Sequence, residues 1–207
     1  FEYERTVDTV TVIGVPKHSK DAAEGVNAIV RLATGLNPLV QHSAIQFIAE
    51  AVGEDATGSS LFGEISDNPS GTLSFISGLT INPDESEIRI DMRIPVLADK
   101  DKLVQELSQI AEEYQLRYEE FDYLAPLYVP LDSELVSTLM AVYKEKTNAV
   151  SSGGATFART MPNCVAFGAL FPGALQTEHQ ANERTVIEDL YKAMDIYAET
   201  IYRLAGK

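Results

Sequence analysis

The sequence predicts an α+β protein in two parts, and three observations predict this organisation. Segments rich in β-branched residues alternate with amphipathic segments over residues 6–122, in the order strand, helix, strand, strand, helix, strand, with a second helical pattern after the first helix. A stretch containing Pro126 and Pro130 follows and is typical of a linker. Beyond it, two amphipathic helical patterns flank a glycine-rich stretch and one apolar segment.

The first elements along the chain are a strand and two helices. Residues 6–14 are rich in valine and threonine, which favours a strand. Ser19 or Asp21 can cap a helix that runs to about residue 34, where Gly35 would end it. A second helical pattern runs from Pro38 to Gly53, with His42 in a structural role, and residues 54–70 are predicted to be a polar loop.

A β-hairpin, a helix and a short strand complete the first part. Residues 72–81 and 85–95 flank an Asn-Pro-Asp turn, and the second segment alternates apolar and charged side chains. A helix capped by Asp99 or Asp101 runs to about residue 115, and a strand is predicted at 116–121. The order βαββαβ is that of a ferredoxin-like sandwich, an antiparallel sheet with its helices on one face.

The second part contains too few strands to form a sheet. We predict a helix capped by Asp132 and Ser133, a strand at 162–170 and a helix at 185–204. One strand cannot satisfy its own backbone hydrogen bonds. We therefore expect the remnant of a larger α/β domain. The start at Phe1, with neither an initiator methionine nor a signal peptide, agrees with a fragment or a processed product.

Charge and composition exclude several classes of partner. The net charge of −15 and the pI of about 4.5 argue against nucleic acid and anionic membranes. No apolar run is long enough to span a bilayer, and we expect a cytoplasmic protein. The single cysteine, Cys164, excludes an intrachain disulfide, and we interpret it as a buried strand residue.

Residues 153–184 contain the main candidates for chemistry. The glycines at the start of this stretch let a backbone approach a ligand closely, and an arginine follows whose planar guanidinium fits a carboxylate. His179 lies near Glu178 and Glu183, which suggests a metal ligand or a proton carrier. The residues alone do not complete a metal site, and they leave His18 and Arg93 as solvated side chains.

Four stretches together resemble a known family. GGATFAR, NCVAFGALFPG and EHQANER resemble the C-terminal signature of the dinuclear metallopeptidases that include carboxypeptidase G, aminoacylase, carnosinase and tripeptidase, and the bacterial PepV-type dipeptidases most of all. GVPKHSKDAAEGVNA resembles the start of that family's lid domain, which is also βαββαβ. The resemblance implies a lid or dimerisation-type domain at residues 1–122 and the C-terminal part of the catalytic domain at residues 123–207.

The resemblance also implies roles for seven residues. His18 would donate a hydrogen bond to the oxyanion of the tetrahedral intermediate, and His179 would bind a metal. The substrate-binding residues would be Arg93, Gly153, Gly154, Thr156 and Arg159, the last four at the substrate carboxylate. Two zinc ions, or manganese, would hold a bridging water, with at most one ligand from this chain.

The implied function is part of a metal-dependent dipeptidase that hydrolyses dipeptides with a free N-terminus. The isolated chain is expected to be inactive because the other metal ligands and the catalytic glutamate lie upstream of Phe1 in the family. The expected partners are that N-terminal catalytic segment, a short-peptide substrate and a second copy bound through the lid. Two alternatives stay open: a non-catalytic ferredoxin-like binding or dimerisation module, and an aminoacylase or tripeptidase of the same family.

Overall fold

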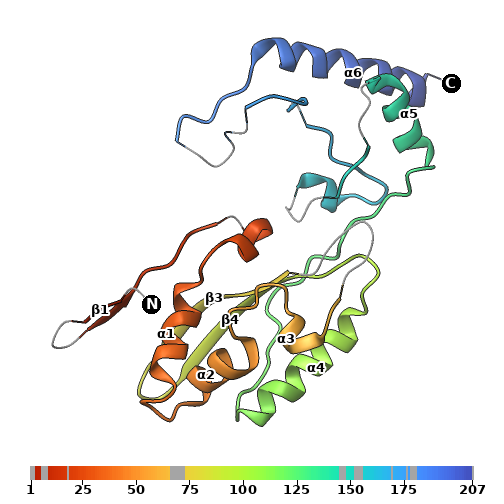
Figure 1. The fold of residues 1–207 in the computed structure, drawn as a ribbon. Coiled ribbons are helices and arrows are strands. Elements are labelled where there is room, and N and C mark those ends of the chain that lie inside the picture. The colour runs from red at the N-terminus through yellow and green to blue at the C-terminus, as the bar shows by residue number, and fades with distance from the viewer. Residues whose placement is uncertain are drawn as a thin grey trace. The chain divides into compact units, whose positions relative to one another are not determined.

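The structure, a computed structural model, describes residues 3–5, 9–17, 19–65, 73–144, 148–151, 156–168, 170–175, 177 and 181–206. The chain divides into two compact units (Figure 1). The first contains Phe1–Pro126 with Ser151–Ala155, and the second contains Leu127–Val150 with Thr156–Lys207. Each unit has its own hydrophobic core.

The first unit begins with a short hairpin and a 3-10 turn. Strands β1 (Tyr3–Arg5) and β2 (Val10–Val12) pair antiparallel, with Glu4 opposite Thr11. The 3-10 helix η1 (Ser19–Glu24) follows, and helix α1 (Ala28–Leu36) begins only after it. The sequence predicted one helix from residue 19 or 21 onwards. The helix is interrupted because the backbone of Val26 pairs with Val15 instead of continuing a helical turn.

Two short helical segments replace the single helix predicted from Pro38 to Gly53. Helix α2 (Ser43–Gln46) continues into the π-helix η2 (Phe47–Val52), which Gly53 ends at φ 61°. His42 is the N-cap of α2, since its Nδ1 accepts a hydrogen bond from the Ala44 N–H at 3.2 Å. Its Nε2 lies 3.1 Å from Ser86 Oγ. His42 therefore joins α2 to the strand that contains Ser86.

The hairpin of β3 (Leu73–Ile81) and β4 (Ser86–Arg93) forms where the sequence predicted it. On β4, Ile88 and Ile90 are partly buried, whereas Glu87 and Arg89 are exposed. The register shifts between Ile76 and Gly78, because Ser77 is an extra residue with no partner position on β4. This β-bulge places Ile76 and Leu79 on the core side although they are three positions apart.

Two further helices complete the first unit. Helix α3 (Ser59–Phe62) lies in the segment that the sequence predicted to be a loop, and its Leu61 is buried. Helix α4 (Lys100–Glu113) begins at Asp99, whose side chain accepts hydrogen bonds from the N–H groups of Asp101 and Lys102 at 3.1 Å. Figure 1 shows α1, α2, α3 and α4 grouped around the β3–β4 hairpin.

The core of the first unit lies between these helices and the hairpin. Phe47, Ile48 and Leu107 are its largest fully buried apolar side chains. The cluster is completed by buried residues of α1, α2, η2, α3 and β3, namely Val30, Ala33, Ile45, Val52, Leu61 and Ile76. Burial of this apolar surface is the main stabilising contribution to the unit.

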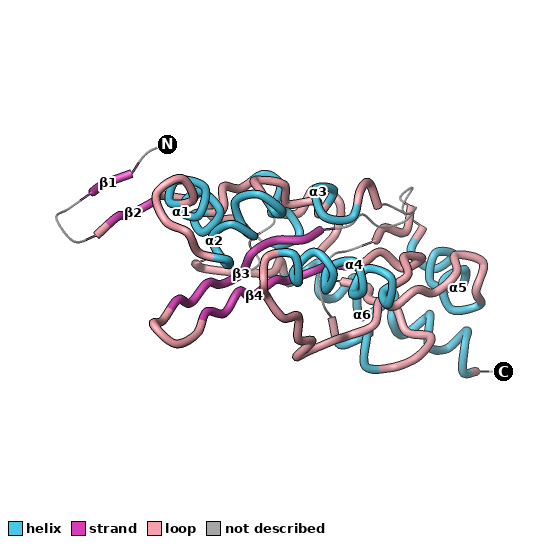
Figure 2. The backbone as a smooth tube through the Cα atoms, turned by 90° about the horizontal axis from the view of Figure 1, so that it is seen from below, coloured by secondary structure: helices cyan, strands magenta, loops and turns pink. Residues whose placement is uncertain are grey.

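The described residues form two separate two-stranded sheets and not the predicted four-stranded one. The β1–β2 and β3–β4 sheets share no hydrogen-bonded strands (Figure 2). Residues 116–121 have no strand pairing. Leu116 and Tyr118 nevertheless pack on the core while Arg117 and Glu119 are exposed, so this segment has the alternation of a strand without its ladder. The first unit is thus a mixed helical and small-sheet structure, as an α+β class requires.

The second unit contains α5 (Glu134–Tyr143), the 3-10 helix η3 (Phe157–Thr160) and α6 (Ile187–Ala205). Ser133 caps α5 by accepting a hydrogen bond from the Val136 N–H at 3.2 Å. The core is formed by Leu139 and Val142 of α5, Ala193 and Ile196 of α6, and Phe171. Tyr143 and Phe167 stack edge to face on it with ring centres 5.2 Å apart.

The strand predicted at residues 162–170 is not found in the described part of this segment. Residues 164–168 have no strand pairing. Cys164 is half-buried, whereas the sequence predicted a buried strand residue. A strand requires a hydrogen-bonded neighbour, and the described residues of this unit supply none. Among the described residues, no helix is long and apolar enough to cross a membrane.

Candidate functional site

The seven site residues inferred from the sequence fall into two groups. His18, Gly153, Gly154 and His179 lie outside the described residues. Arg93 lies at the end of β4 in the first unit, and Thr156 and Arg159 lie at η3 in the second unit.

The segment that contains position 18 is closed at its base by two backbone hydrogen bonds. The N–H of Val15 donates to the carbonyl of Val26, and the N–H of Val26 donates back to Val15, both at 3.0 Å. On one side of the loop, Lys17 Nζ forms a salt bridge with Glu24 at 3.0 Å. The two ends of the loop are therefore held together as in an antiparallel pair.

Glycines permit this close approach of the two backbones. A Cβ atom on Gly14 would lie 2.5 Å from the carbonyl oxygen of Val26. One on Gly25 would lie 2.9 Å from the carbonyl oxygen of Val15. Both contacts are too short for any side chain and involve backbone, which cannot move aside cheaply. Glycine is required at both positions for steric reasons.

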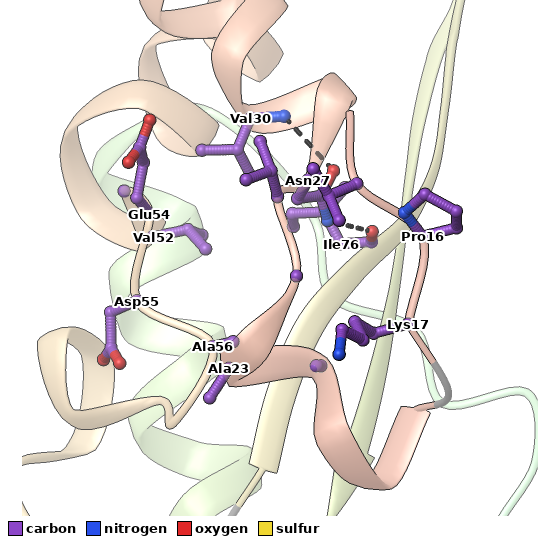
Figure 3. A pocket seen from close by; sticks show the side chains of 15 residues that line it. Pro16, Lys17, Ala23, Asn27, Val30, Val52, Glu54, Asp55, Ala56 and Ile76 are labelled. Carbon is purple, nitrogen blue, oxygen red and sulfur yellow. Dashed lines mark hydrogen bonds between the residues drawn. The ribbon is translucent and has the colours of Figure 1, made fainter. Parts of the chain in front are cut away.

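Asn27 ties the end of this loop to α1 and to β3. Its Oδ1 accepts hydrogen bonds from the N–H groups of Ile29 at 3.0 Å and Val30 at 3.4 Å, which caps α1. Its Nδ2 donates to the carbonyl of Ile76 at 2.7 Å (Figure 3). One partly buried amide thus uses both ends to fix the loop against the β3–β4 hairpin, the element on which Arg93 lies.

A pocket of about 380 Å³ lies beside the loop, within the first unit. Its walls are the loop on one side and residues 52–56 on the other, with Val30 and Ile76 between them. Figure 3 shows Lys17 on one side of the pocket and Glu54 and Asp55 on the other. Lys17 and Glu54 already have partners, since Lys17 pairs with Glu24 and Glu54 lies 3.4 Å from Arg31 Nε.

Asp55 organises the turn that enters α3. Its Oδ1 accepts hydrogen bonds from the N–H and Oγ1 of Thr57, at 2.8 and 2.5 Å, and its Oδ2 accepts them from Ser59 Oγ and the Ser60 N–H, at 2.8 and 2.9 Å. Partial burial raises the pKa of this carboxyl, but the hydrogen bonds outweigh it and hold the pKa well below its usual range. The charged form is therefore strongly favoured, and its acceptor positions are occupied.

Arg93 is held beside Asp91 without full hydrogen bonding. The Arg93 Nη2 donates to Asp91 Oδ2 at 3.3 Å, and Nε lies 3.2 Å from Oδ1 of the same carboxylate. The buried Nε–H is not aligned with this carboxylate for a hydrogen bond, and it donates none to any described residue. A guanidinium with a donor left over can still bind a further oxygen, which is the property that a substrate-binding arginine needs.

Thr156 and Arg159 belong to one 3-10 turn. Thr156 caps η3, since its Oγ1 accepts a hydrogen bond from the Ala158 N–H at 3.3 Å, and its carbonyl accepts one from the Arg159 N–H at 3.1 Å. Arg159 is half-buried, whereas Phe157 between them keeps 91% of its surface exposed. The turn thus fixes the spacing of these two predicted carboxylate-binding residues.

The described residues do not by themselves form a metal centre. Across that part of the chain, no three histidine, cysteine, aspartate or glutamate side chains come together as ligands. The one metal ligand that the resemblance implies, His179, lies outside it. The described residues therefore do not fit a complete zinc site.

Comparison with known proteins identifies the family. Residues 5–203 match the family described as peptidase family M20/M25/M40. The chain belongs to this peptidase family. The match extends over both compact units and includes the loop closed by Val15 and Val26, the β3–β4 hairpin and most of α6.

Curated relatives of this M20/M25/M40 chain bear dipeptidase names. It is 33% identical over 203 residues to the putative dipeptidase YtjP of Bacillus subtilis (strain 168), in a match that covers 93% of this chain and 43% of the relative. It is 28% identical over 221 residues to the Beta-Ala-Xaa dipeptidase of Lactobacillus delbrueckii subsp. lactis, covering 99% and 45%. A putative dipeptidase of Staphylococcus aureus (strain MW2) is 26% identical, covering 97% and 46%. The chain spans less than half the length of these relatives.

The sequence did not reveal the roles of two residues that organise the loop at 15–26 and the turn that enters α3. Asn27 precedes an apolar helical pattern, and an asparagine there is a recognisable N-cap signal. Asp55 is followed by Thr57, Ser59 and Ser60, which is a spacing that predicts side-chain to backbone hydrogen bonds in a turn. The contact of Asn27 with Ile76, 49 positions away, has no such local signal.

Proposed function

We propose that this chain forms the lid and the C-terminal part of the catalytic domain of a metal-dependent dipeptidase that hydrolyses dipeptides with a free N-terminus. The observation that carries the proposal is the family match over residues 5–203, together with dipeptidase-named relatives that cover 93–99% of the chain. Residues 1–122 would be the lid and residues 123–207 the catalytic part. A complete ferredoxin-like sheet would require β2 and residues 116–121 to pair with β3 and β4.

His18 would stabilise the oxyanion that forms when the scissile carbonyl is attacked. The anchoring of its loop supports this role. The Val15–Val26 pair and the Asn27 bridge to Ile76 hold both ends of the loop against the hairpin. A histidine on such a loop would be positioned by the fold before substrate arrives, and preorganised donors are the ones that contribute most to rate.

Arg93 would bind the substrate from the same unit. Its Nε–H supports this role, because this group lies in an ion pair with Asp91 but donates no hydrogen bond among the described residues, and a substrate oxygen could accept that hydrogen bond. Asp91 would hold the guanidinium in place while leaving it positively charged. Gly153, Gly154, Thr156 and Arg159 would receive the carboxylate of the dipeptide, with backbone N–H groups and one cation.

His179 would be the one metal ligand contributed by this chain. The two zinc ions, or manganese ions, of the complete peptidase would supply an activated water. The other ligands and the general base would come from a catalytic segment outside this chain, and the isolated chain would not hydrolyse peptides. We also propose the cytoplasm as its location, and dimerisation through the lid as its mode of association.

A chimera tests the proposal. The segment of the Lactobacillus Beta-Ala-Xaa dipeptidase that matches this chain, 45% of that protein, is replaced by this chain, and β-alanyl dipeptide hydrolysis is measured with and without a chelator. We expect metal-dependent hydrolysis by the chimera and none by the 207-residue chain alone. The Arg93→Ala chimera should have a KM raised at least about tenfold, and Arg89→Ala, an exposed arginine of the same strand, is the control.

Two results would contradict the proposal. A folded chimera without hydrolysis would show that this chain cannot supply the lid and C-terminal functions of a dipeptidase. Metal-dependent hydrolysis by the 207-residue chain alone, free of other proteases, would show that it contains a complete catalytic site.

A further inference from the structure

The imidazole ring of His42 has two hydrogen-bond partners that together require its neutral form. Its Nδ1 accepts a hydrogen bond from the Ala44 N–H at 3.2 Å, and its Nε2 lies 3.1 Å from Ser86 Oγ. A backbone N–H can only donate, so Nδ1 must be the ring nitrogen without a proton. The neutral ring therefore has its proton on Nε2, which donates to Ser86 Oγ.

A protonated ring could keep only one of these two bonds. Imidazolium has an N–H group at both nitrogens and no lone pair left to accept a hydrogen bond. Its Nδ1–H and the Ala44 N–H would then point toward each other, whereas the bond from Nε2 to Ser86 would stay the same. Protonation therefore removes the cap of α2 and leaves the connection of His42 to β4 intact.

This cap holds one end of a continuous helical segment. α2 is only four residues long, and His42 accepts hydrogen bonds from two of its N–H groups, that of Ala44 through the ring and that of Gln46 through the backbone carbonyl at 2.9 Å. α2 continues directly into η2, whose last residue, Val52, lines the pocket beside the 15–26 loop (Figure 3). The segment that His42 caps thus leads to the pocket wall.

We propose that protonation of His42 is an acid-sensitive switch that loosens the segment from α2 to the pocket wall. An imidazole in water takes up its proton near about pH 6.5. Because the cap requires the neutral ring, its stabilising contribution is complete above this pH and is lost as the pH falls below it. The inference uses only contacts within the first unit and goes beyond the proposed function.

The charged groups around His42 do not replace the lost bond. α2 itself has no charged residue. The charged residues of the elements that contact α2, and of the adjoining hairpin turn, are Arg31 of α1, Glu50 of η2, Asp84 and Glu85 of the turn, and Glu87, Arg89, Asp91 and Arg93 of β4. Among the described residues, none of these charges forms a hydrogen bond or an ion pair with His42. The imidazolium would therefore gain no carboxylate partner in exchange for the cap.

Hydrogen exchange of the 207-residue chain at about pH 7.5 and about pH 5 tests the switch. The measured quantity is the protection factor, which is corrected for the intrinsic effect of pH on exchange. We expect the protection of residues 44–53, relative to that of α4, to fall by about fivefold at the lower pH, which is the effect of losing one N-cap.

Two variants separate the cap from the connection to β4. His42→Asn keeps an acceptor for the Ala44 N–H but does not titrate, so protection should be the same at both pH values. His42→Ser serves the same purpose if the asparagine variant folds poorly, since serine is also a preferred N-cap. Ser86→Ala is the control, because it removes the bond that both forms of the ring make and should lower protection equally at both pH values.

Three results would overturn the switch. The first is unchanged protection of residues 44–53 at the lower pH. The second is an equal acid-dependent loss in the His42→Asn variant, which would assign the effect to another titrating group. The third is a loss in α4 as large as that in residues 44–53, which would show that acid destabilises the whole unit and not this segment.

Discussion

Asp55 shows how one carboxylate can hold a turn and make stability depend on pH. Its folded-state pKa lies well below the usual range because Thr57, Ser59 and Ser60 donate hydrogen bonds to the charged form. For a lowered pKa, the stabilising contribution is complete above the unfolded pKa of about 4. It is lost as the pH falls toward the lower folded-state value.

We expect Asp55→Asn to lower the free energy of unfolding by about 1 kcal/mol at pH 7, which is the typical cost of losing an N-cap. The expected loss is no larger because the Asp55 side chain is partly exposed and solvent screens its charge. The difference from the parent chain should narrow below about pH 4. Urea unfolding of both chains between pH 7 and pH 3 measures it. A difference that stays constant over this range would show that the charge of Asp55 does not stabilise the turn.

The two ends of the Asn27 side-chain amide have different partners, so their contributions to stability can be separated by substitution. Asn27→Ala should lower the free energy of unfolding by about 2 kcal/mol, through the lost cap and the lost bond to Ile76. Asn27→Asp keeps the cap oxygen but cannot donate to the Ile76 carbonyl at pH 7, and should recover only part of this loss. Denaturant unfolding distinguishes the two contributions.

Asn37→Ala is the control for these variants, since the Asn37 amide donates to the exposed side chain of Glu50 and its loss should cost less than about 0.5 kcal/mol. Equal stability of the Asn27→Asp variant and the parent chain would mean that the bridge to β3 contributes nothing.

At the residue scale, sequence reasoning succeeded where the signal is local. The sequence predicted Asp99 or Asp101 as one helix cap and Asp132 with Ser133 as another, and in the structure Asp99 and Ser133 are the caps. From the residues alone, Arg93 was expected to be a solvated side chain on the polar face of a strand; the structure places it at the end of β4 but finds it partly buried, with its Nε buried. The donor that Arg93 leaves without an acceptor could not be predicted, because it depends on the orientation of the Asp91 carboxylate and not on spacing.

At the element scale, the base of the 15–26 loop depends on two backbones in contact. We expect Gly14→Ala to destabilise the first unit by about 1–3 kcal/mol, because its Cβ would lie 2.5 Å from a backbone oxygen and force the pair apart. Gly35→Ala is the opposite case, since that Cβ meets nothing within 4 Å and α1 gains helix propensity. It should be stabilising by about 0.5 kcal/mol.

Thermal unfolding of the two alanine variants measures both effects in one experiment. A Gly14→Ala variant as stable as the parent chain would show that the Val15–Val26 pair can separate at little cost.

Strands were harder to predict than helices, and the reason is physical. The 72–81 and 85–95 segments were predicted correctly because each provides the partner of the other across a short turn. Residues 116–121 and 162–170 have strand-like patterns, but a pattern does not reveal whether a neighbouring strand exists. The sequence did not predict the π-helix at Phe47–Val52, because over so few residues the apolar spacing of a π-helix hardly differs from that of an α-helix.

At the scale of the whole molecule, two hydrophobic clusters share no residue. We expect Leu107→Ala, at a site 1% exposed, to cost about 2–5 kcal/mol and to lower hydrogen-exchange protection in α1 and α4. Protection in α5 and α6 should change little. Ile196→Ala should produce the reverse pattern. Equal loss in both units from either variant would show that the chain unfolds as a single cooperative body.

The predicted division at residue 122 and the assignment of the parts as lid and catalytic remnant stay predictions, although two compact units exist. The family could be recognised because its motifs combine over nearly the whole chain. Arg93 belongs to one unit and Arg159 to the other, so no local sequence pattern could predict a joint role for these two residues.

The bulge at Ser77 has a consequence for how the hairpin tolerates changes in chain length. β3 has one residue more than its ladder with β4 uses. Deleting Ser77 would bring Ile76 and Leu79 to the two-residue spacing of a regular strand, with both still facing the core. Deleting Arg89 instead would turn either Ile88 or Ile90 toward solvent. Natural or engineered shortening of this hairpin should therefore be accepted on the bulged strand and rejected on the strand that faces it.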